Sequence, residues 1–303
     1  MDITILLPGY NEADNLEPLF RQIRTVLDNL KLKAEVLFVN DGSTDDTKEV
    51  LETIKEWVSE LRVIHHPVRV GLTATIETGI LAAKGDIIVY LCSDMQSHPK
   101  EDIPKLLSAL DDDCDVVLGY RVNRFDCKIV VSWIYNTLVR LLFGLKVHDL
   151  NWIKAFRKKC LDNIHLQSDW HRYFPLFAHS QGYKIKEIPT KCYPRGHGKS
   201  NFGFGRILIG FLDLLVVKFY LSYMKSPMLF FGSLGVIFIG LGCLLGGCLL
   251  FYLIATAFQF RLALGYYVVL ILLILMGIQF FSFGFLAEYL VSIRNDIKKN
   301  ETI

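Results

Sequence analysis

Residues 35–45 read Glu-Val-Leu-Phe-Val-Asn-Asp-Gly-Ser-Thr-Asp, an apolar run of strand length followed directly by a polar turn. The same succession occurs at Ile3–Leu7, which ends at Pro8-Gly9, and again at Ile87–Leu91. Near-continuous apolar strands separated by other elements are typical of a parallel sheet that is buried on both faces. The sequence therefore predicts an α/β domain built around a mainly parallel sheet.

Segments with helical periodicity separate the predicted strands. Apolar side chains recur every three to four residues through 15–29. The other expected helices are Thr44–Val58, Thr73–Ala83 and Pro99–Leu110, and the other expected strands are Leu61–His65 and Val116–Leu118. Such a sheet binds its ligands outside the carboxyl ends of its strands. No Gly-x-Gly-x-x-Gly follows the first strand and no Gly-Lys-Ser/Thr loop occurs, so the dinucleotide-binding and P-loop classes lose their support.

Composition separates a charge-rich part of the chain from an apolar part. The 303 residues carry 33 Lys+Arg against 31 Asp+Glu, a net charge of +2, and 52% of them are apolar. This balance excludes intrinsic disorder and gives no electrostatic reason to expect a nucleic-acid partner. No charged residue lies between Lys225 and Arg261, and none lies between Arg261 and Glu288. Both runs exceed the ~20 residues that a membrane-spanning helix needs.

These two runs predict transmembrane helices near 228–257 and 264–288; the alternative is a helical hairpin buried in a larger soluble domain. Two spans leave both chain ends on one side of the cell membrane. The connecting loop holds only Arg261, whereas several Lys and Arg flank the pair, so the positive-inside rule predicts a cytoplasmic N-terminal domain and cytoplasmic termini. Seven cysteines without metal or disulfide spacing agree with a reducing compartment.

The predicted organisation has four parts. Residues 1–205 form the cytoplasmic domain, 206–226 an amphipathic interfacial segment, 227–290 the two spans and 291–303 a cytoplasmic tail. A core helix is the alternative for the interfacial segment. Glycines in the first span permit close helix packing, either with the second span or with another copy of the chain, so a homo-oligomer is one of two readings.

Polar clusters lie where the predicted strands end. Asp41 could accept a hydrogen bond from a nucleobase or ribose, or its segment could be a tight turn with a helix cap at Ser43 or Thr44. Asp94 and Gln96, two apart on a segment expected to be extended, would direct two oxygens to one point. Oxygen ligands suit Mg²⁺ or Mn²⁺, whereas a cap on the following helix is the alternative.

A group of cations and hydroxyls follows the next predicted strand. Its members are Arg121, Arg124, Lys128, Ser132, Tyr135 and Asn136. Such side chains near a strand end can hold a phosphate, whereas a solvated charged face is the alternative. The clusters support one another, because a nucleoside site, a metal site and a phosphate site would then share one sheet edge.

The segments Pro8-Gly-Tyr-Asn-Glu12, Asn40-Asp-Gly-Ser-Thr-Asp45 and Ser93-Asp-Met-Gln96 follow one another along the chain. Together they resemble the nucleotide-sugar glycosyltransferases of the GT-A fold, family 2. Other segments narrow the resemblance to polyprenyl-phosphate glycosyltransferases such as the dolichyl-phosphate mannose synthases. These segments are Arg121-x-x-Arg124, Ser132-x-x-Tyr135-Asn136, Asp149-Leu-Asn-Trp-Ile-Lys-Ala-Phe-Arg157, Arg195-Gly-His-Gly-Lys199-Ser200 and the C-terminal hairpin. The resemblance covers essentially the whole chain.

The resemblance implies a role for each matching position. The nucleoside diphosphate sugar, with UDP or GDP, would be held by Pro8, Tyr10, Glu12, Val39, Asp41, Ser93, Asp94, Arg195 and Lys199. The acceptor phosphate of a polyprenyl lipid, undecaprenyl or dolichyl, would be held by Arg121, Lys128 and Ser132. Asp94 and Gln96 would bind Mg²⁺ or Mn²⁺, and the catalytic residues would be Asp94, Arg121 and Asp149. The implied product is a polyprenyl-phosphate monosaccharide with inverted anomeric configuration.

Cys92 departs from the family pattern, which usually reads Asp-x-Asp-x-Gln at residues 92–96. A neutral thiol is a poor ligand for Mg²⁺. We therefore expect weaker metal binding, or a changed metal preference, relative to the usual site.

Other functions fit parts of the pattern. A processive polysaccharide synthase shares the nucleotide motifs but usually has a Gln-x-x-Arg-Trp signature and more spans, and neither occurs here. A membrane-tethered transferase could instead glycosylate a soluble or protein acceptor. A non-catalytic membrane partner subunit would agree with Cys92.

Overall fold

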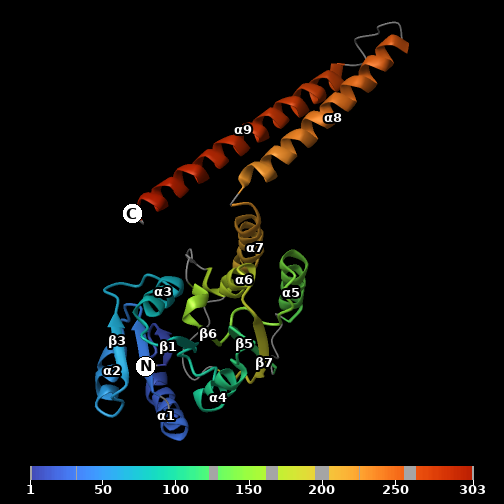
Figure 1. Ribbon diagram of the computed structural model, residues 1–303. Coiled ribbons are helices and arrows are strands. Elements are labelled where there is room, and N and C mark those ends of the chain that lie inside the picture. Colours follow the sequence, from blue (N-terminus) through green and yellow to red (C-terminus); the bar gives the residue numbers. More distant parts are fainter. Residues whose placement is uncertain are drawn as a thin grey trace. The chain divides into compact units, whose positions relative to one another are not determined.

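Figure 1 shows the computed structural model of the chain, which describes residues 2–31, 33–122, 129–161, 170–194, 205–224, 226–255 and 264–301. The side chains of residues 129–133, 205–208 and 298–301 are outside this description. The chain divides into two compact units, Met1–Leu214 and Leu215–Ile303.

A seven-stranded sheet forms the centre of the first unit (Figure 1). Its strands are β1 (Ile3–Gly9), β2 (Ala34–Asn40), β3 (Leu61–His65), β4 (Ile87–Tyr90), β5 (Val116–Arg121), β6 (Lys154–Arg157) and β7 (Ile185–Thr190), in the spatial order β3-β2-β1-β4-β6-β5-β7. Among the described strands β6 alone runs antiparallel, to both β4 and β5. The predicted mainly parallel sheet is confirmed.

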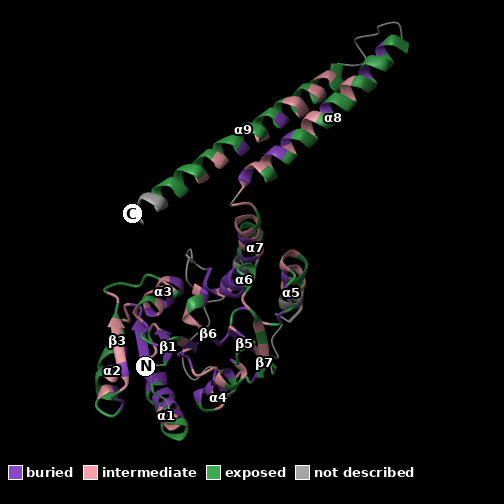
Figure 2. Cartoon of the chain, in the orientation of Figure 1, coloured by how far each residue is buried: buried purple, intermediate pink, exposed green. Residues whose placement is uncertain are grey.

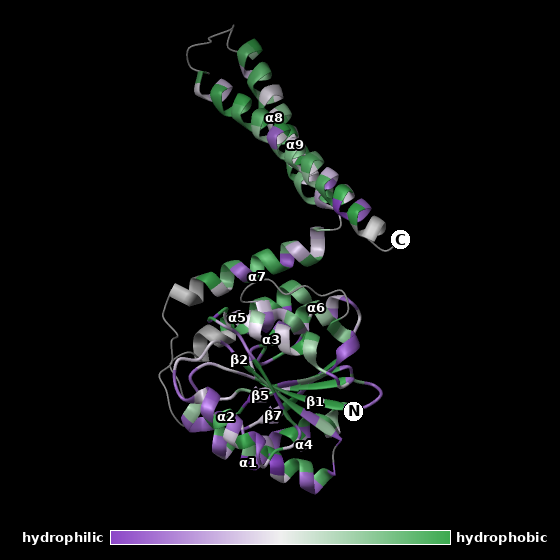
Figure 3. Ribbon diagram, turned by 90° about the vertical axis from the view of Figure 1, so that its left-hand side faces the viewer, coloured by the Kyte–Doolittle hydropathy of each residue, from purple (hydrophilic) through white to green (hydrophobic). Residues whose placement is uncertain are grey.

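Helices cover both faces of this sheet, as Figure 3 shows. They are α1 (Ala13–Leu30), α2 (Thr47–Lys55), α3 (Leu72–Ala82), α4 (Pro99–Ala109), α5 (Ile129–Phe143) and α6 (Phe174–Ser180), with short 3₁₀ turns at Lys158–Leu161 and Trp170–Tyr173. Helices α1, α2 and α4 lie on one face, and α3 and α6 lie on the other. Neighbouring residues of β1 are consequently both buried, Ile5 toward one layer and Leu6 toward the other, which explains the unbroken apolar runs.

The observed elements differ from the predicted ones in two ways. Helix α2 begins at Thr47 rather than Thr44, because Ser43 and Thr44 bind Asn11 across the sheet edge and cap no helix. The alternative of a helix cap at Ser43 or Thr44 therefore does not hold. The sequence does not predict α5, α6, β6 or β7, since β6 is only four residues long and β7 holds two adjacent charged residues and a proline beside its two isoleucines.

The second unit contains α8 (Pro227–Ala255) and α9 (Leu264–Glu301), and α7 (Gly205–Tyr223) crosses the boundary between the units. Both α8 and α9 are long and apolar enough to cross a membrane. Most of their described side chains are not buried (Figure 2), although the helices are hydrophobic over most of their length (Figure 3). The two predicted spans coincide with these helices, and α9 continues through most of the predicted tail.

The two long helices approach each other closely at a pair of glycines. A Cβ on Gly277 would lie 2.5 Å from Cγ1 of Ile239 and 2.8 Å from the carbonyl oxygen of Gly235. Gly277→Leu is therefore expected to force α8 and α9 apart and to lower the free energy of unfolding by about 1–3 kcal/mol.

Gly247→Leu is the matched control, because nothing lies within 4 Å of its Cβ position. The free energy of unfolding of both variants is measured by circular dichroism while the detergent-solubilised protein is titrated with SDS. Equal destabilisation by the two substitutions would contradict the close packing at Gly277.

Candidate active site

The carboxyl ends of the parallel strands bring several predicted site residues to one sheet edge. Strands β2, β1 and β4 are adjacent and parallel, and Gly9 lies opposite Asn40 where the first two end. The predicted residues at this edge are Tyr10, Asp41, Asp94 and Arg121. This is the place where open α/β sheets bind ligands.

Hydrogen bonds lock the loop after β1 to the loop after β2. The Asn11 N–H donates to Oγ of Ser43 at 2.9 Å, and the Glu12 N–H donates to Oγ1 of Thr47 at 3.0 Å. Asn11 has a φ of +57°, a left-handed conformation that asparagine adopts more readily than most residues. The polar motifs after the two strands thus hold each other in place at the sheet edge.

Asp41 is almost fully buried and anchors the loop after β3. Its Oδ1 accepts the Val70 N–H at 2.8 Å and its Oδ2 accepts the Gly71 N–H at 3.0 Å. In the same loop, the Arg69 guanidinium lies 4.1 Å from the centroid of the Tyr10 ring. The predicted nucleoside residues Tyr10 and Asp41 therefore both contact a loop that sequence reasoning did not single out.

The other residues predicted to bind the nucleotide sugar differ in exposure and in their hydrogen bonds. Pro8 and Val39 are buried, so neither side chain is exposed at the sheet edge, and their nucleoside contacts stay predictions. The Ser93 hydroxyl donates to the carbonyl oxygen of Pro8 at 2.7 Å, which ties the end of β4 to the end of β1. Glu12 keeps a partly exposed side chain, and its Oε2 accepts from Nδ2 of Asn15 at 2.6 Å.

The loop after β4 is bent rather than extended, which corrects the expected geometry of Asp94 and Gln96. Met95 between them has a φ of +60°, and the Gln96 N–H donates to Oδ1 of Asp94 at 3.2 Å. At the start of α4 the His98 N–H donates instead to Oδ2 of Asp102, at 2.9 Å. The alternative that the pair caps α4 does not hold, and both oxygen-bearing side chains stay at the sheet edge.

Cys92 stands where the family usually has an aspartate, and it remains a neutral thiol. Burial, and then the neighbouring Asp94 carboxylate, raise the pKa of Cys92 to about 12. Within the described ranges no group of three or more His, Cys, Asp or Glu side chains is arranged to hold a metal ion. Asp94 and Gln96 fit Mg²⁺ or Mn²⁺ as two oxygen ligands, and diphosphate oxygens and water would complete the coordination.

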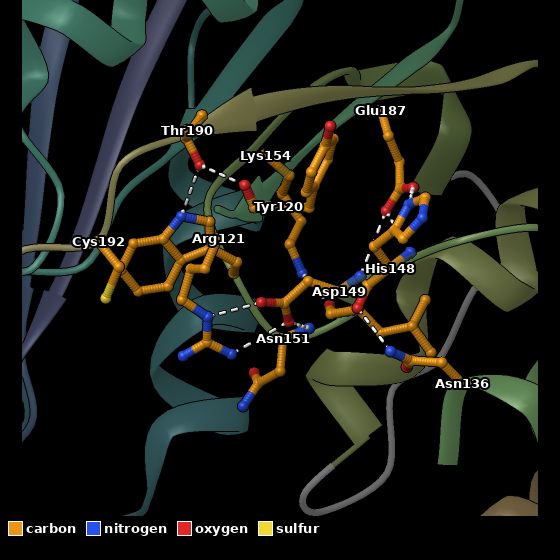
Figure 4. Close-up of polar contacts among 12 residues, drawn as sticks. Tyr120, Arg121, Asn136, His148, Asp149, Asn151, Lys154, Glu187, Thr190 and Cys192 are labelled. Atoms are coloured by element: carbon orange, nitrogen blue, oxygen red, sulfur yellow. Dashed lines mark hydrogen bonds and ion pairs between the residues drawn. The ribbon is translucent and has the colours of Figure 1, made fainter. Parts of the chain in front are cut away.

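Arg121 and Asp149, which were predicted separately, form one ion pair (Figure 4). Nε of Arg121 donates to Oδ2 at 2.6 Å and Nη2 donates to Oδ1 at 3.1 Å, with side chains only 18% and 12% exposed. Burial by itself would lower the pKa of Arg121, but the Asp149 carboxylate more than offsets this, so the net pKa is raised. The guanidinium also lies 4.8 Å from the centroid of the Trp152 ring.

Residues from β7 and α5 position the Asp149 segment (Figure 4). Oε1 of Glu187 accepts the N–H groups of His148 and Asp149 at 2.8 and 3.3 Å, and its Oε2 lies 2.8 Å from Nδ1 of His148. Asn136 donates from Nδ2 to the His148 carbonyl oxygen at 2.6 Å. Asn136 therefore holds this loop, and Glu187 is a residue whose role sequence reasoning missed.

Lys154 is a second residue that sequence reasoning missed. It is 5% exposed, and its Nζ donates to the carbonyl oxygen of Leu150 at 3.3 Å. Burial lowers the pKa of Lys154 to about 8. The available signal was a single lysine within the otherwise apolar stretch 152–156.

Several predicted residues lie outside the described part of the structure. Lys128, Arg195 and Lys199 belong to segments that are not described, and Ser132 lies on α5 without a described side chain. Their contacts with donor or acceptor phosphates stay predictions.

Curated relatives match the chain over nearly its full length. A dodecaprenyl-phosphate galacturonate synthase of Rhizobium johnstonii is 31% identical over 302 residues, which is 95% of this chain and 87% of that protein. An undecaprenyl-phosphate 4-deoxy-4-formamido-L-arabinose transferase of Salmonella choleraesuis is 29% identical, over 98% of this chain and 90% of that protein.

Solved structures share the fold. Glucosyl-3-phosphoglycerate synthase from Mycobacterium tuberculosis, in complex with Mn²⁺, UDP and phosphoglyceric acid, has a TM-score of 0.58 and 20% identity, over 72% of this chain and 78% of that chain. A mannosyltransferase from Pyrobaculum calidifontis, in complex with GDP-Man and Mn²⁺, has a TM-score of 0.53 and 19% identity, over 72% of this chain and 62% of that chain. At these identities the likeness shows the GT-A fold alone.

The family model described as glycosyl transferase family 2 matches residues 4–175. That range is more than half of the chain, and it runs from the second residue of β1 through β6, with Tyr10, Asp41, Asp94, Arg121 and Asp149 inside it. The chain therefore belongs to glycosyl transferase family 2.

Proposed function

We propose that this protein transfers a sugar from a nucleoside diphosphate sugar to a polyprenyl phosphate. The observation that carries the proposal is the presence, in one chain, of the family 2 site with its Arg121–Asp149 pair and of two helices long enough to span a membrane. Relatives matched over 95% and 98% of this chain are named for dodecaprenyl and undecaprenyl phosphate, which supports the choice of acceptor.

On the donor side, Tyr10 and Asp41 would hold the nucleoside of UDP or GDP. Asp94 and Gln96 would hold Mg²⁺ or Mn²⁺, which when bound would offset the charge of the diphosphate. Arg195 and Lys199 would add positive charge near the leaving group. Catalysis by this set is mainly alignment of the donor and stabilisation of the departing diphosphate.

On the acceptor side, an oxygen of the lipid phosphate is the nucleophile. Because the second pKa of a phosphate monoester is about 6, this oxygen is ionised near neutral pH and needs little help from a base. It attacks the anomeric carbon as the bond to the diphosphate breaks on the opposite side, which inverts the configuration. Arg121 would hold the acceptor phosphate together with Lys128 and Ser132, and Asp149 would fix the orientation of the guanidinium.

The membrane-length helices explain how enzyme and acceptor meet. A long polyprenyl chain stays in the bilayer, since each buried CH₂ group contributes about 0.8 kcal/mol. Helices α8 and α9 would keep the enzyme in the same membrane as this lipid. We propose that α7 lies at the interface, with the N-terminal domain and both termini on the cytoplasmic side.

Lipid extraction tests this function directly. Membranes that contain the protein are incubated with a panel of radiolabelled UDP- and GDP-sugars, and the expected result is label in the organic phase with one of them. The labelled product should be acid-labile, and its amount should increase when polyprenyl phosphate is added. Label that remains in the aqueous or protein fraction would favour another acceptor, and no turnover with any sugar despite nucleotide binding would favour a non-catalytic subunit.

A further inference from the structure

Lys154 places a buried positive charge at the carboxyl edge of the sheet. Because β6 runs antiparallel to β4, the residues that precede Lys154 lie toward this edge. Its side chain turns back in that direction, and Nζ donates to the carbonyl oxygen of Leu150, the residue after Asp149. Figure 4 shows Lys154 among the residues that surround Asp149.

No carboxylate hydrogen-bonds to this ammonium in the described part of the structure, and the Asp149 carboxylate, which binds Arg121, attracts it only at longer range. Nζ lies 5.4 Å from the centroid of the Tyr90 ring, and among the described ion pairs none involves Lys154. His171, which packs on the same side, is held by Thr73 at 2.8 Å, and burial followed by Lys154 itself lowers the pKa of His171 to about 3, so the imidazole is neutral. Burying a cation without a carboxylate bonded directly to it is costly, which makes the position of Lys154 informative.

The charge balance of the edge depends on Cys92. Arg121 and Lys154 contribute two positive charges, and Asp94 and Asp149 contribute two negative charges, so these four groups sum to zero. The aspartate that the family usually has at residue 92 would change this sum to −1. A site with a net negative charge repels a diphosphate and needs a divalent cation to bind it. A neutral site repels the diphosphate less and depends less on the cation.

We propose that Lys154, which lies near Cys92 where the family usually has an aspartate, acts as a resident cation of the donor site and attracts the diphosphate of the nucleotide sugar. Lys154 acts through space and is not a contact residue. Binding of the donor diphosphate in this protein consequently depends less on Mg²⁺ or Mn²⁺ than it would with an aspartate at residue 92. This inference rests on the proposed use of a nucleoside diphosphate sugar, but not on the identity of the acceptor.

Calorimetric titration of the full-length protein in detergent tests the proposal, with UDP and GDP as probes and with either Mg²⁺ or EDTA present. Lys154→Met and Cys92→Asp each make the site more negative by one charge. Each should therefore weaken binding of the preferred nucleoside diphosphate in EDTA by at least about tenfold, the effect of one unit charge on another about 12 Å away at an effective dielectric constant of about 20. Added Mg²⁺ should restore binding in Cys92→Asp, which gains a carboxylate ligand, by a larger factor than in the wild type.

Two controls separate this electrostatic effect from damage to the fold. Binding of the uncharged nucleoside, uridine or guanosine, should stay within about twofold in both variants, because it carries no diphosphate. Lys158→Met is the matched variant, since the Lys158 Nζ also donates to a backbone carbonyl, that of Ala83 at 2.7 Å, but at the other end of β6. It should leave binding of the nucleoside diphosphate unchanged.

Unchanged diphosphate binding in EDTA for Lys154→Met and Cys92→Asp would overturn the proposal. So would an equal loss of nucleoside and nucleoside diphosphate binding, which indicates a structural role for Lys154. Failure of the proposed function gives a different result. In that case the binding differences are still observed, but label from sugar nucleotides never reaches the lipid fraction.

Discussion

Asp94→Ala is expected to lower the rate of sugar transfer by about 10³-fold, because it removes the one carboxylate that the proposed metal site retains. Cys92 cannot compensate, since its thiol stays protonated at neutral pH. Asp94→Asn should lose a similar factor but should recover part of the activity as Mn²⁺ is raised, because its amide oxygen remains a weak ligand. Initial rates of label transfer to lipid, measured across a metal titration, give both effects.

Asp102→Asn is the matched control for this experiment. Asp102 is the next aspartate along the chain, and its Oδ2 accepts the His98 N–H at the start of α4. Burial raises the pKa of Asp102 to about 6, but the residue takes no part in the proposed chemistry. Asp102→Asn should change thermal stability while the rate per folded molecule is kept. Full activity of Asp94→Ala would remove the metal assignment.

Arg121→Lys is expected to reduce transfer by about 10²–10³-fold, although it preserves the positive charge. A lysine presents a point charge, whereas Arg121 uses Nε and Nη2 to bind Asp149 with two hydrogen bonds, which leaves Nη1 without a partner among the described residues. Because the acceptor phosphate is the proposed ligand, the KM for polyprenyl phosphate should rise while the Kd for the nucleoside diphosphate changes little. Steady-state kinetics with varied lipid, beside calorimetry with nucleotide, separate the two.

Arg157→Ala provides the control for Arg121. Arg157 donates to the carbonyl oxygen of Asp111 and pairs with the exposed Asp112 at 3.9 Å, so its removal should cost little stability and no activity. Asp149→Asn should resemble Arg121→Lys, and the double variant should lose much less than the product of the two single losses, because the pair acts as one unit. Loss of donor binding alone in Arg121→Lys would show that the acceptor assignment is wrong.

The positions of the strands and of their terminal clusters could be predicted because both follow from local patterns. A strand buried on both faces must be apolar throughout, as at Ile5 and Leu6, and the turn after it must be polar. The membrane-length helices were equally predictable, since their length and lack of charge follow from the thickness of a bilayer. The predicted extended geometry of Asp94 and Gln96 was wrong because the left-handed backbone of Met95 leaves no mark in a sequence.

By itself, then, the sequence determined the α/β class, the sheet edge that carries the candidate residues and the two apolar helices. Only the tertiary structure decided that Arg121 binds Asp149, 28 positions along the chain, and that Lys154 is buried near this pair without a carboxylate bonded directly to it. The physical reason is the distance along the chain over which each interaction acts. Periodicity and turn chemistry act between neighbours in the chain, whereas the partner of a charge is chosen by strand order, here by the antiparallel insertion of β6 between β4 and β5.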